Sequence, residues 1–286
     1  MPGPELSTPQ ALAGTFALVT CVKLLLMESY HSTDYEVHRN WLAIAASLRP
    51  SKWYFDTTSM WSLDYPPLFA FFERALVPIA RVFDPEMARV ENLDYLTRAS
   101  HHFMRLSVIC TDVALGFGTW CCCSGETGFD RRGGLLTLLN GGLLLVDHIH
   151  FQYNGFLFGI LLMSIGLLRK SEESPGRGLA GGALFAGLLV LKHLFLPMAP
   201  VFFVHLLGGF CRPNGCFRVG RFLALALSVV FVIACPFMLL ILDHSQDSGA
   251  SFVVSARLQL QQIRGRLFPF SASSSDCQQS SGIVSK

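Results

Sequence analysis

Seven apolar runs divide this chain into candidate membrane spans, and they constrain its fold more than any other feature. They cover residues 11–27, 103–123, 133–146, 155–168, 179–191, 195–210 and 222–242. A straight membrane-spanning helix needs about 20 residues, so the shorter runs must be half-helices or extend into their flanks. The third run is the weakest candidate because Asn140 interrupts it. The pattern predicts an all-α polytopic membrane protein with about seven spans.

Composition excludes several other classes of protein. Charged residues make up 15% of the 286 residues, against about 25% in an ordinary soluble domain. The 22 Lys and Arg residues against 20 Asp and Glu residues give a net charge of +2, so no basic surface favours a nucleic-acid partner. The nine cysteines include the adjacent Cys121, Cys122 and Cys123 but no C-x-x-C pair, so a zinc site is not expected.

Basic residues in the short loops indicate the orientation of the spans, because positively charged loops stay cytoplasmic. If the N-terminus is cytoplasmic, the basic loops all fall on its side of the membrane. They contain Arg131, Arg132, Arg169, Lys170, Arg177, Arg212, Arg218 and Arg221. We therefore expect a cytoplasmic N-terminus at 1–10, a first span at 11–27, a non-cytoplasmic loop at 28–101, a bundle of about six spans at 102–242, a second non-cytoplasmic segment at 243–270 and a disordered Ser-rich tail at 271–286.

The loop 28–101 contains a helix start with a carboxylate in its first turn. Thr33 and Glu36 have the T-x-x-E spacing of a capping box, so we expect Thr33 to be the N-cap and Asp34 the first helical residue. The positive end of the helix dipole favours the ionised form of Asp34. From spacing alone, Asp34 is either an ordinary helix-start carboxylate or a functional one, and His38 and Arg39 fit a solvated helix face.

A second ordered element follows in the same loop. Pro67 suits the first turn of a new helix, so Asp64 and Tyr65 are held just before it. Residues 68–83 mix apolar side chains with charged ones such as Glu73, which predicts an interfacial amphipathic helix. A rigid loop with carboxylates above an apolar platform suits a lipid-borne substrate, and the same pattern also suits a structural lid.

The turn 147–154 packs polar side chains between two apolar runs, and such a cluster at a membrane boundary indicates function by default. Its His148, His150 and Gln152 suit recognition of a sugar or phosphate. Metal binding by the two histidines is the less favoured alternative, because no third ligand stands at a familiar spacing.

Lys192 and His193 lie between two apolar runs on the same side of the membrane as this turn. Lys192 could neutralise a phosphate, or it could simply extend its ammonium group to the membrane surface. The G-x-x-x-G motifs that begin at Gly155 and Gly178 predict close contact between helices.

Three motifs resemble those of the dolichyl-phosphate-glucose-dependent glucosyltransferases of the endoplasmic reticulum. They read H-S-T-D-Y-E-V-H-R-N-W from residue 31, W-S-L-D-Y-P-P-L from residue 61 and V-D-H-I-H-F-Q-Y-N-G-F-L-F-G from residue 146. The resemblance runs from about residue 21 to residue 270. The wording of the first and third motifs favours the step that adds the second glucose over the step that adds the first.

The resemblance implies a GT-C-type enzyme of the endoplasmic reticulum membrane, with its active site facing the lumen. It implies dolichyl phosphate glucose as the donor and the glucosylated, mannose-rich dolichyl-diphosphate oligosaccharide as the acceptor, with inverting transfer in α-1,3 linkage. The family's base is the aspartate of the first luminal loop, which matches Asp34. No cofactor is implied, and no metal either, because the chain has no D-x-D motif. The further substrate-binding residues that we expect are Asp64, Tyr65, His38, Arg39, His148, His150, Gln152, Lys192 and His193.

Members of this family are much longer, whereas the R-L-F-P-F sequence at 266–270 runs here into a Ser/Gln-rich tail. We therefore expect a truncated or alternatively spliced product. The main alternative to an active transferase is an inactive membrane fragment that binds lipid-linked glycan or partner transferases. A small-solute transporter is less favoured, because the acidic residues lie in a long loop rather than at the middle of the membrane.

Overall fold

The structure is a computed structural model that describes residues 8–125, 128–129, 131–171 and 174–267. It divides into two compact units, residues 1–240 and residues 241–286. The second unit is described only as a helical segment that ends at Leu267. The tail expected at 271–286 lies outside the described residues, and the boundaries expected for the other segments stay predictions.

Helices make up nearly all of the regular structure in the described residues. The α-helices are α1 (Thr8–Leu25), α2 (Thr33–Ser47), α3 (Pro67–Phe83), α4 (Arg98–Thr111), α5 (Val113–Cys123), α6 (Arg131–Leu138), α7 (Gly141–Leu145), α8 (Asn154–Arg169), α9 (Pro175–Leu191), α10 (Ala199–His205) and α11 (Val219–Leu267). The 3₁₀ turns are η1 (Pro50–Phe55), η2 (Pro85–Ala88), η4 (His193–Met198) and η6 (Pro213–Gly215), and the π-helical turns are η3 (Val146–Phe151) and η5 (Leu206–Phe210). Strands β1 (Ser124–Gly125) and β2 (Gly128–Phe129) pair as a minimal antiparallel hairpin.

Four helical segments of the described chain are long and apolar enough to cross a membrane. They are Arg98–Cys123, Arg132–Phe151, His193–Phe210 and Val219–His244. Three shorter apolar helices cover Gln10–Leu25, Asn154–Arg169 and Pro175–Leu191. Each segment overlaps one of the seven predicted runs, which supports an all-helical membrane protein. Because the three shorter helices fall below the length of a straight span, the number of seven spans stays a prediction.

Polar residues lie inside two of the long segments. Asn140 caps α7, and its side chain accepts a hydrogen bond from the Leu143 N–H at 3.0 Å, which confirms the interruption predicted there. Asp112 lies between α4 and α5, but its N–H donates to the Val108 carbonyl and its own carbonyl accepts from the Gly116 N–H, so helical hydrogen bonding continues across it. At Asn140 the side-chain cap satisfies one of the backbone N–H groups that the break leaves free.

Glycines allow α5 and α8 to lie in close contact. A Cβ atom on Gly118 would meet the backbone of Gly159, and a Cβ atom on Gly159 would meet the backbone of Ala114 and Leu115. Larger residues would therefore force the two helices apart. This confirms the close helix contact predicted from the motif that begins at Gly155.

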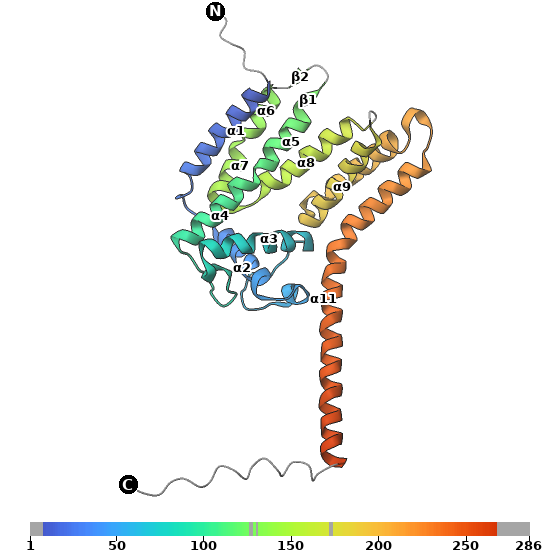
Figure 1. Ribbon diagram of the computed structural model, residues 1–286. Helices are drawn as coiled ribbons and strands as arrows, with labels where there is room; N and C mark the ends of the chain where they lie inside the picture. The colour runs from blue at the N-terminus through green and yellow to red at the C-terminus, as the bar shows by residue number, and fades with distance from the viewer. Residues whose placement is uncertain (1–7, 126–127, 130, 172–173, 268–286) are drawn as a thin grey trace, which may run out of the picture. The chain divides into compact units, whose positions relative to one another are not determined.

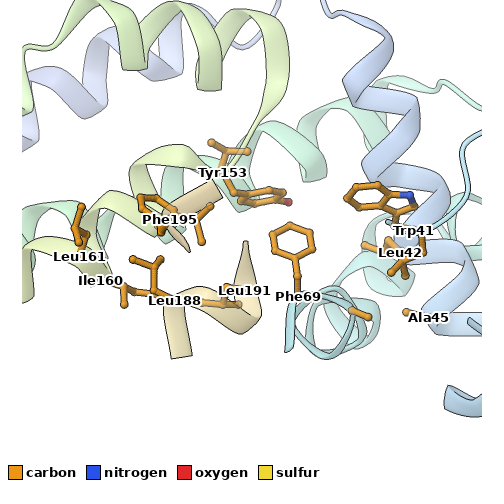
Figure 2. Close-up of a cluster of buried hydrophobic side chains, with 14 of the residues drawn as sticks. Trp41, Leu42, Ala45, Phe69, Tyr153, Ile160, Leu161, Leu188, Leu191 and Phe195 are labelled. Atoms are coloured by element: carbon orange, nitrogen blue, oxygen red, sulfur yellow. The ribbon is translucent and has the colours of Figure 1, made fainter. Parts of the chain in front are cut away.

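The loop 28–101 folds into α2 and α3, which pack on each other and on the ends of the apolar helices. One buried apolar cluster runs from this loop into α8 and α9. Figure 2 shows Trp41 of α2 on one side of the cluster, Leu161 and Leu188 on the other, and Tyr153 between them. The ring centroids of Tyr153 and Phe69 are 6.0 Å apart, within the range of favourable aromatic contacts.

The two ends of the first unit differ in chemistry. Figure 1 shows α2 and α3 at one end, and β1, β2 and α6 at the other, where α6 begins with two of the basic residues expected on the cytoplasmic side. The polar loop 28–101 is thus separated from the basic loops by the length of the helices. This separation is what the expected orientation requires, and the orientation itself stays a prediction.

Candidate active site

Asp34 lies in the first turn of α2, where an N-cap residue and the turn η3 hold its backbone. The N-cap is Ser32, whose hydroxyl oxygen accepts a hydrogen bond from the Asp34 N–H at 3.2 Å. The same hydroxyl donates to the His150 carbonyl at 2.5 Å, so the start of α2 is tied to η3. The prediction that Thr33 is the N-cap is wrong by one residue, since Thr33 is already helical.

Two side-chain nitrogen atoms lie next to one oxygen of the Asp34 carboxylate. Gln152 Nε2 donates to Asp34 Oδ2 at 2.7 Å, and His150 Nε2 lies 3.1 Å from the same atom. The Asp34 side chain is 30% exposed. Because both contacts use Oδ2, the carboxylate can present Oδ1 to another group. The structure thus brings together three of the predicted site residues.

Lys192, which caps the C-terminus of α9, joins this cluster. Its Nζ donates to Asn154 Oδ1 at 3.2 Å and lies 5.0 Å from the ring centroid of Tyr65, a cation–π distance. Burial lowers the pKa of Lys192, and the charges of Asp147, Asp34 and Asp64 oppose that change. An ammonium group among carboxylates, half-buried and next to the Asp34 cluster, can attract a phosphate.

Tyr65 and Asp64 come from the segment before α3. The Tyr65 ring packs 4.8 Å from Trp41, and its backbone carbonyl accepts a hydrogen bond from the Tyr54 hydroxyl at 2.7 Å. Burial raises the pKa of Tyr65, so its hydroxyl stays neutral. Asp64 is exposed and acts on Lys192 through its charge. Pro67 is the first residue of α3, as predicted.

His38 and Glu73 form a buried pair, which corrects the expectation of a solvated His38. His38 is 3% exposed and Glu73 is 0% exposed, although the spacing favours a solvated face for His38. His38 Nδ1 lies 3.0 Å from Glu73 Oε1, and Glu73 Oε2 has no hydrogen-bond partner among the described residues. Burial lowers the pKa of His38 to about 3 and raises that of Glu73 well above its usual value. Burial therefore favours the neutral form of both groups, which lowers the cost of burying a charge.

Arg39 is also buried, because its donors have partners inside the loop. Its guanidinium forms two hydrogen bonds of 2.6 Å with the carboxylate of Glu36 and donates to the Met87 carbonyl at 3.0 Å. The expectation of a solvated Arg39 is wrong for this reason. Glu36 pairs with Arg39 and accepts from the Asp94 N–H at 3.0 Å, so it does not close the predicted capping box. The pair ties the two ends of the loop together.

The side chain of His148 contacts Asp112 and lies apart from the Asp34 cluster. Its Nε2 lies 2.8 Å from Asp112 Oδ2, and Lys23 Nζ donates to the same oxygen at 2.6 Å. All three side chains are nearly inaccessible. The structure thus separates His148 from His150, although the sequence grouped them. His193 is exposed at the start of η4.

The backbone of η3 is held by Arg105 of α4. Its guanidinium donates to the carbonyls of His148 at 2.8 Å, Ile149 at 2.9 Å and Tyr30 at 2.8 Å. Phe151, which ends η3, has a φ of 94°, in a region that aromatic residues rarely adopt. Its ring is fully buried. Such strain costs about 1–3 kcal/mol and persists only where the surroundings fix the residue, often at functional sites.

Four residues that organise this site are not among the residues predicted from the sequence: Lys23, Arg105, Asp112 and Asn154. Lys23, Arg105 and Asp112 are charged residues in or beside apolar runs, and charge at membrane depth was the available signal. Asn154 lies in the polar turn but was not singled out. Among the residues that the structure describes, no group of three or more His, Cys, Asp or Glu side chains could hold a metal ion.

The cluster suits one type of chemistry. Asp34 offers a carboxylate with Oδ2 hydrogen-bonded and Oδ1 available. The ammonium group of Lys192 lies in the same cluster, next to the aromatic ring of Tyr65. A carboxylate of this kind can take a proton from a hydroxyl, and the ammonium can stabilise an anion that forms or leaves beside it.

Comparison with known proteins agrees with this chemistry. Residues 19–273 match the ALG6, ALG8 glycosyltransferase family. A protein of Arabidopsis thaliana is 44% identical over 268 residues, which is 93% of this chain and 49% of that protein. A protein of Mus musculus is 45% identical over 266 residues (88% of this chain, 48% of that protein), and one of Schizosaccharomyces pombe is 41% identical over 268 residues (91% and 49%). All three are named dolichyl pyrophosphate Glc1Man9GlcNAc2 alpha-1,3-glucosyltransferase.

The chain spans about half the length of these curated relatives. The matched part includes the loop 28–101, the turn η3 and Lys192, which together make up the cluster around Asp34. The family match covers far more than half of the chain, and the chain belongs to the ALG6, ALG8 glycosyltransferase family.

Proposed function

We propose that this chain transfers glucose from dolichyl phosphate glucose to the one-glucose, mannose-rich oligosaccharide on dolichyl diphosphate, adding the second glucose in α-1,3 linkage. The names of its relatives, which specify a Glc1Man9GlcNAc2 acceptor, support the acceptor and the linkage. The motif around Asp34 resembles those of dolichyl-phosphate-glucose-dependent enzymes, which supports dolichyl phosphate glucose as the donor. The observation that carries the proposal is the Asp34 carboxylate, held through Oδ2 by Gln152 and His150.

Asp34 acts as the general base. Its Oδ1 takes the proton of the attacking acceptor hydroxyl while that oxygen bonds to C1 of the glucose. The bond from C1 to the phosphate oxygen breaks on the opposite face, and dolichyl phosphate leaves with the electron pair. Because the attack is a single displacement, a β-linked donor yields an α-linked product. A positioned base of this kind contributes about 10²–10⁴-fold to the rate.

The other side chains bind and orient. Lys192 faces the phosphate of the donor, where its ammonium stabilises the leaving group. His150 and Gln152 hold the carboxylate, and Tyr65 and Asp64 line the approach to it. The leaving group is already a stable anion, so the reaction needs no carboxylic acid to protonate it.

The site works on the luminal face of the endoplasmic reticulum membrane. The helix α2, which carries Asp34, lies at the end of the first unit away from the basic loops (Figure 1), and His150 contacts Asp34 there. Positively charged loops stay cytoplasmic, so this end faces the lumen. A lipid donor and a lipid acceptor can both reach a site at this boundary.

A transfer assay tests the proposal. Membranes that lack the full-length second-glucose enzyme receive this chain and dolichyl phosphate glucose, and the lipid-linked oligosaccharides are then sized. We expect conversion of the one-glucose to the two-glucose form, reduced about 10²–10⁴-fold by Asp34→Asn. Asp56→Asn is the matched control, because the carboxylate of Asp56 accepts hydrogen bonds from Thr58 within an exposed turn.

Two outcomes contradict the proposal. Equal conversion by Asp34→Asn would remove Asp34 from the role of base. No conversion by a stably expressed chain would favour the inactive fragment, which still binds lipid-linked glycan or partner transferases without turnover.

A further inference from the structure

A continuous set of hydrogen bonds runs from the buried Asp147 to Asp34. Asn154 Nδ2 donates to Asp147 Oδ1 at 2.9 Å and to Gln152 Oε1 at 2.8 Å. Gln152 Nε2 then donates to Asp34 Oδ2 at 2.7 Å. Two amide side chains therefore connect a buried carboxylate with the carboxylate of the proposed base.

Charged neighbours determine which way the first amide points. Asp147 accepts from the amide nitrogen of Asn154, and Lys192 Nζ donates to the amide oxygen at 3.2 Å. A reversed Asn154 would set its oxygen against the Asp147 carboxylate and its NH₂ group against the Lys192 ammonium. Both contacts would become repulsive, so Asn154 has one orientation.

The orientation of Asn154 determines that of Gln152. The second hydrogen of the Asn154 NH₂ group needs an acceptor, and Gln152 Oε1 supplies it. Gln152 must then turn its own NH₂ group towards Asp34. A reversed Gln152 would set its carbonyl oxygen against the carboxylate and lose the hydrogen bond that it donates to Asp34.

Asp147 is a fixed anchor for this set of bonds. Its side chain is 0% exposed, and its Oδ2 accepts from the Gly155 N–H at 2.5 Å, at the start of α8. A Cβ atom on Gly155 would clash with Asp112 Oδ1. Glycine therefore allows the two carboxylates to approach the start of α8.

We propose that Asn154, anchored by Asp147, is a positioning residue that makes Gln152 donate to Asp34 rather than accept. This inference rests on the proposed role of Asp34 as a base. A carboxylate that receives a donor at Oδ2 keeps Oδ1 directed at the acceptor hydroxyl. Asn154 acts through Gln152 and needs no contact with substrate.

The test must allow for the other charges around Asp34. They are His150 and Asp147 of η3, Lys192 after α9 and Asp64 before α3. A substitution that should reverse the Gln152 amide is therefore compared with a substitution that only removes the Asn154 amide. Asn154→Asp keeps the size and an acceptor for Lys192 but can no longer donate to Gln152, so Gln152 turns its NH₂ group to the new carboxylate. Asn154→Ala leaves Gln152 free to keep its donation to Asp34.

The readout is the reaction of Asp34 with dicyclohexylcarbodiimide, which modifies protonated carboxyl groups, measured by peptide mass spectrometry on the purified full chain across pH. Asp34 is open to the reagent because its side chain is 30% exposed. We expect the pH of half-maximal labelling to rise by about one unit in Asn154→Asp and by less in Asn154→Ala. A purely structural role predicts the opposite order, because alanine removes more contacts.

A double variant separates orientation from the added negative charge. In a Gln152→Ala background, Asn154→Asp should shift the labelling of Asp34 much less, because Gln152 no longer transmits the change. An undiminished shift there would overturn the proposal, as would an effect of Asn154→Ala equal to or larger than that of Asn154→Asp.

This readout needs no glucose transfer, so it is independent of the proposed function. If the labelling follows the expected order but the chain transfers no glucose, the positioning inference holds and the transferase proposal fails. If the chain transfers glucose, the acidic limb of its pH–rate profile should shift to higher pH in Asn154→Asp, in step with the labelling.

Discussion

Two clusters of similar composition meet at the turn η3, and they differ in their access to water. The closed cluster consists of Lys23, Asp112 and His148, and the open cluster of Lys192, Asp34 and His150. Side chains of the closed cluster are 3–6% exposed, whereas Asp34 is 30% and His150 48% exposed. Each cluster combines a carboxylate, a histidine and a lysine. Composition alone therefore does not show which of the two can react with a substrate.

The difference in exposure assigns different roles. Charges buried without water must be paired at all times, so the closed cluster fixes α1, the junction of α4 and α5, and η3 relative to one another. The open cluster keeps a carboxylate oxygen available at the membrane boundary, where a hydroxyl group can reach it. The strained turn of η3 connects the two, since it carries both histidines.

The largest effect should follow from breaking the closed cluster. Lys23→Met leaves the buried Asp112 with His148 alone, and removing one partner of a buried ion pair costs about 3–5 kcal/mol. We expect a large fall in the melting temperature of the purified chain in detergent. Lys52→Met is the control, because Lys52 is exposed in η1.

A compensating variant tests the cause of that loss. Replacing both charges, in Lys23→Met with Asp112→Leu, removes the uncompensated carboxylate and should recover most of the stability. If the double variant melts as low as Lys23→Met, packing rather than charge holds this region together.

A second effect should appear in the pH dependence of stability at the buried His38–Glu73 pair. The pKa of Glu73 is raised by burial, so its contribution to stability is present below the unfolded value of 4.5 and is lost as pH rises towards the folded value. Glu73→Gln cannot ionise in the unfolded state. The variant should therefore gain stability relative to the parent as pH rises above 4.5, by up to about 1.4 kcal/mol per pH unit.

The histidine of that pair acts in the opposite pH direction. Burial lowers the pKa of His38 to about 3, so its contribution is present above 6.5 and is lost as pH falls towards 3. The Glu73→Gln variant still loses the stability contribution of His38 as pH falls. That loss serves as an internal reference for melting curves measured between pH 4 and pH 8. Glu91→Gln, at an exposed position, should follow the parent at every pH. If the melting temperatures of Glu73→Gln and of the parent change in parallel with pH, Glu73 is ionised in the folded protein.

The smallest effect on stability should come from the open cluster. His150→Ala removes a half-exposed contact with Asp34, and such pairs contribute about 0.2–1 kcal/mol. His148→Ala removes a buried partner of Asp112 and should cost about 1–3 kcal/mol. The melting temperatures of the two variants, measured side by side, show directly how far the clusters differ. Equal losses would contradict the assignment of one cluster to structure and the other to chemistry.

Much of the fold could be predicted from the sequence, because its signals are local. The apolar runs, the break at Asn140 and the helix start at Pro67 each depend on a few neighbouring residues. The close contact of α5 and α8 follows from small residues at one helical spacing. The helix that begins near Asp34 was placed correctly to within one residue, although Ser32 and not Thr33 caps it.

The candidate site could be predicted only in part, because contacts between distant segments decide it. Asp34, His150 and Gln152 were expected, and the structure brings them together from two segments far apart in the chain. His38 looked solvated because nothing near it in the sequence reveals Glu73, 35 residues away. The separation of His148 from His150 depends on the π-helical turn η3. The order of polar and apolar residues along the chain does not predict such a turn.

The sequence by itself determined the class of this protein, a helical membrane protein whose polar groups gather in two segments, and its motifs carried the resemblance to a family. Hydrophobic length and charge act locally, so they can be read along the chain. Only the tertiary structure decided which carboxylate is open and which is locked, and which way the amides of Asn154 and Gln152 point. Those properties depend on burial and on hydrogen-bond partners, and a chain acquires both only when distant segments pack together.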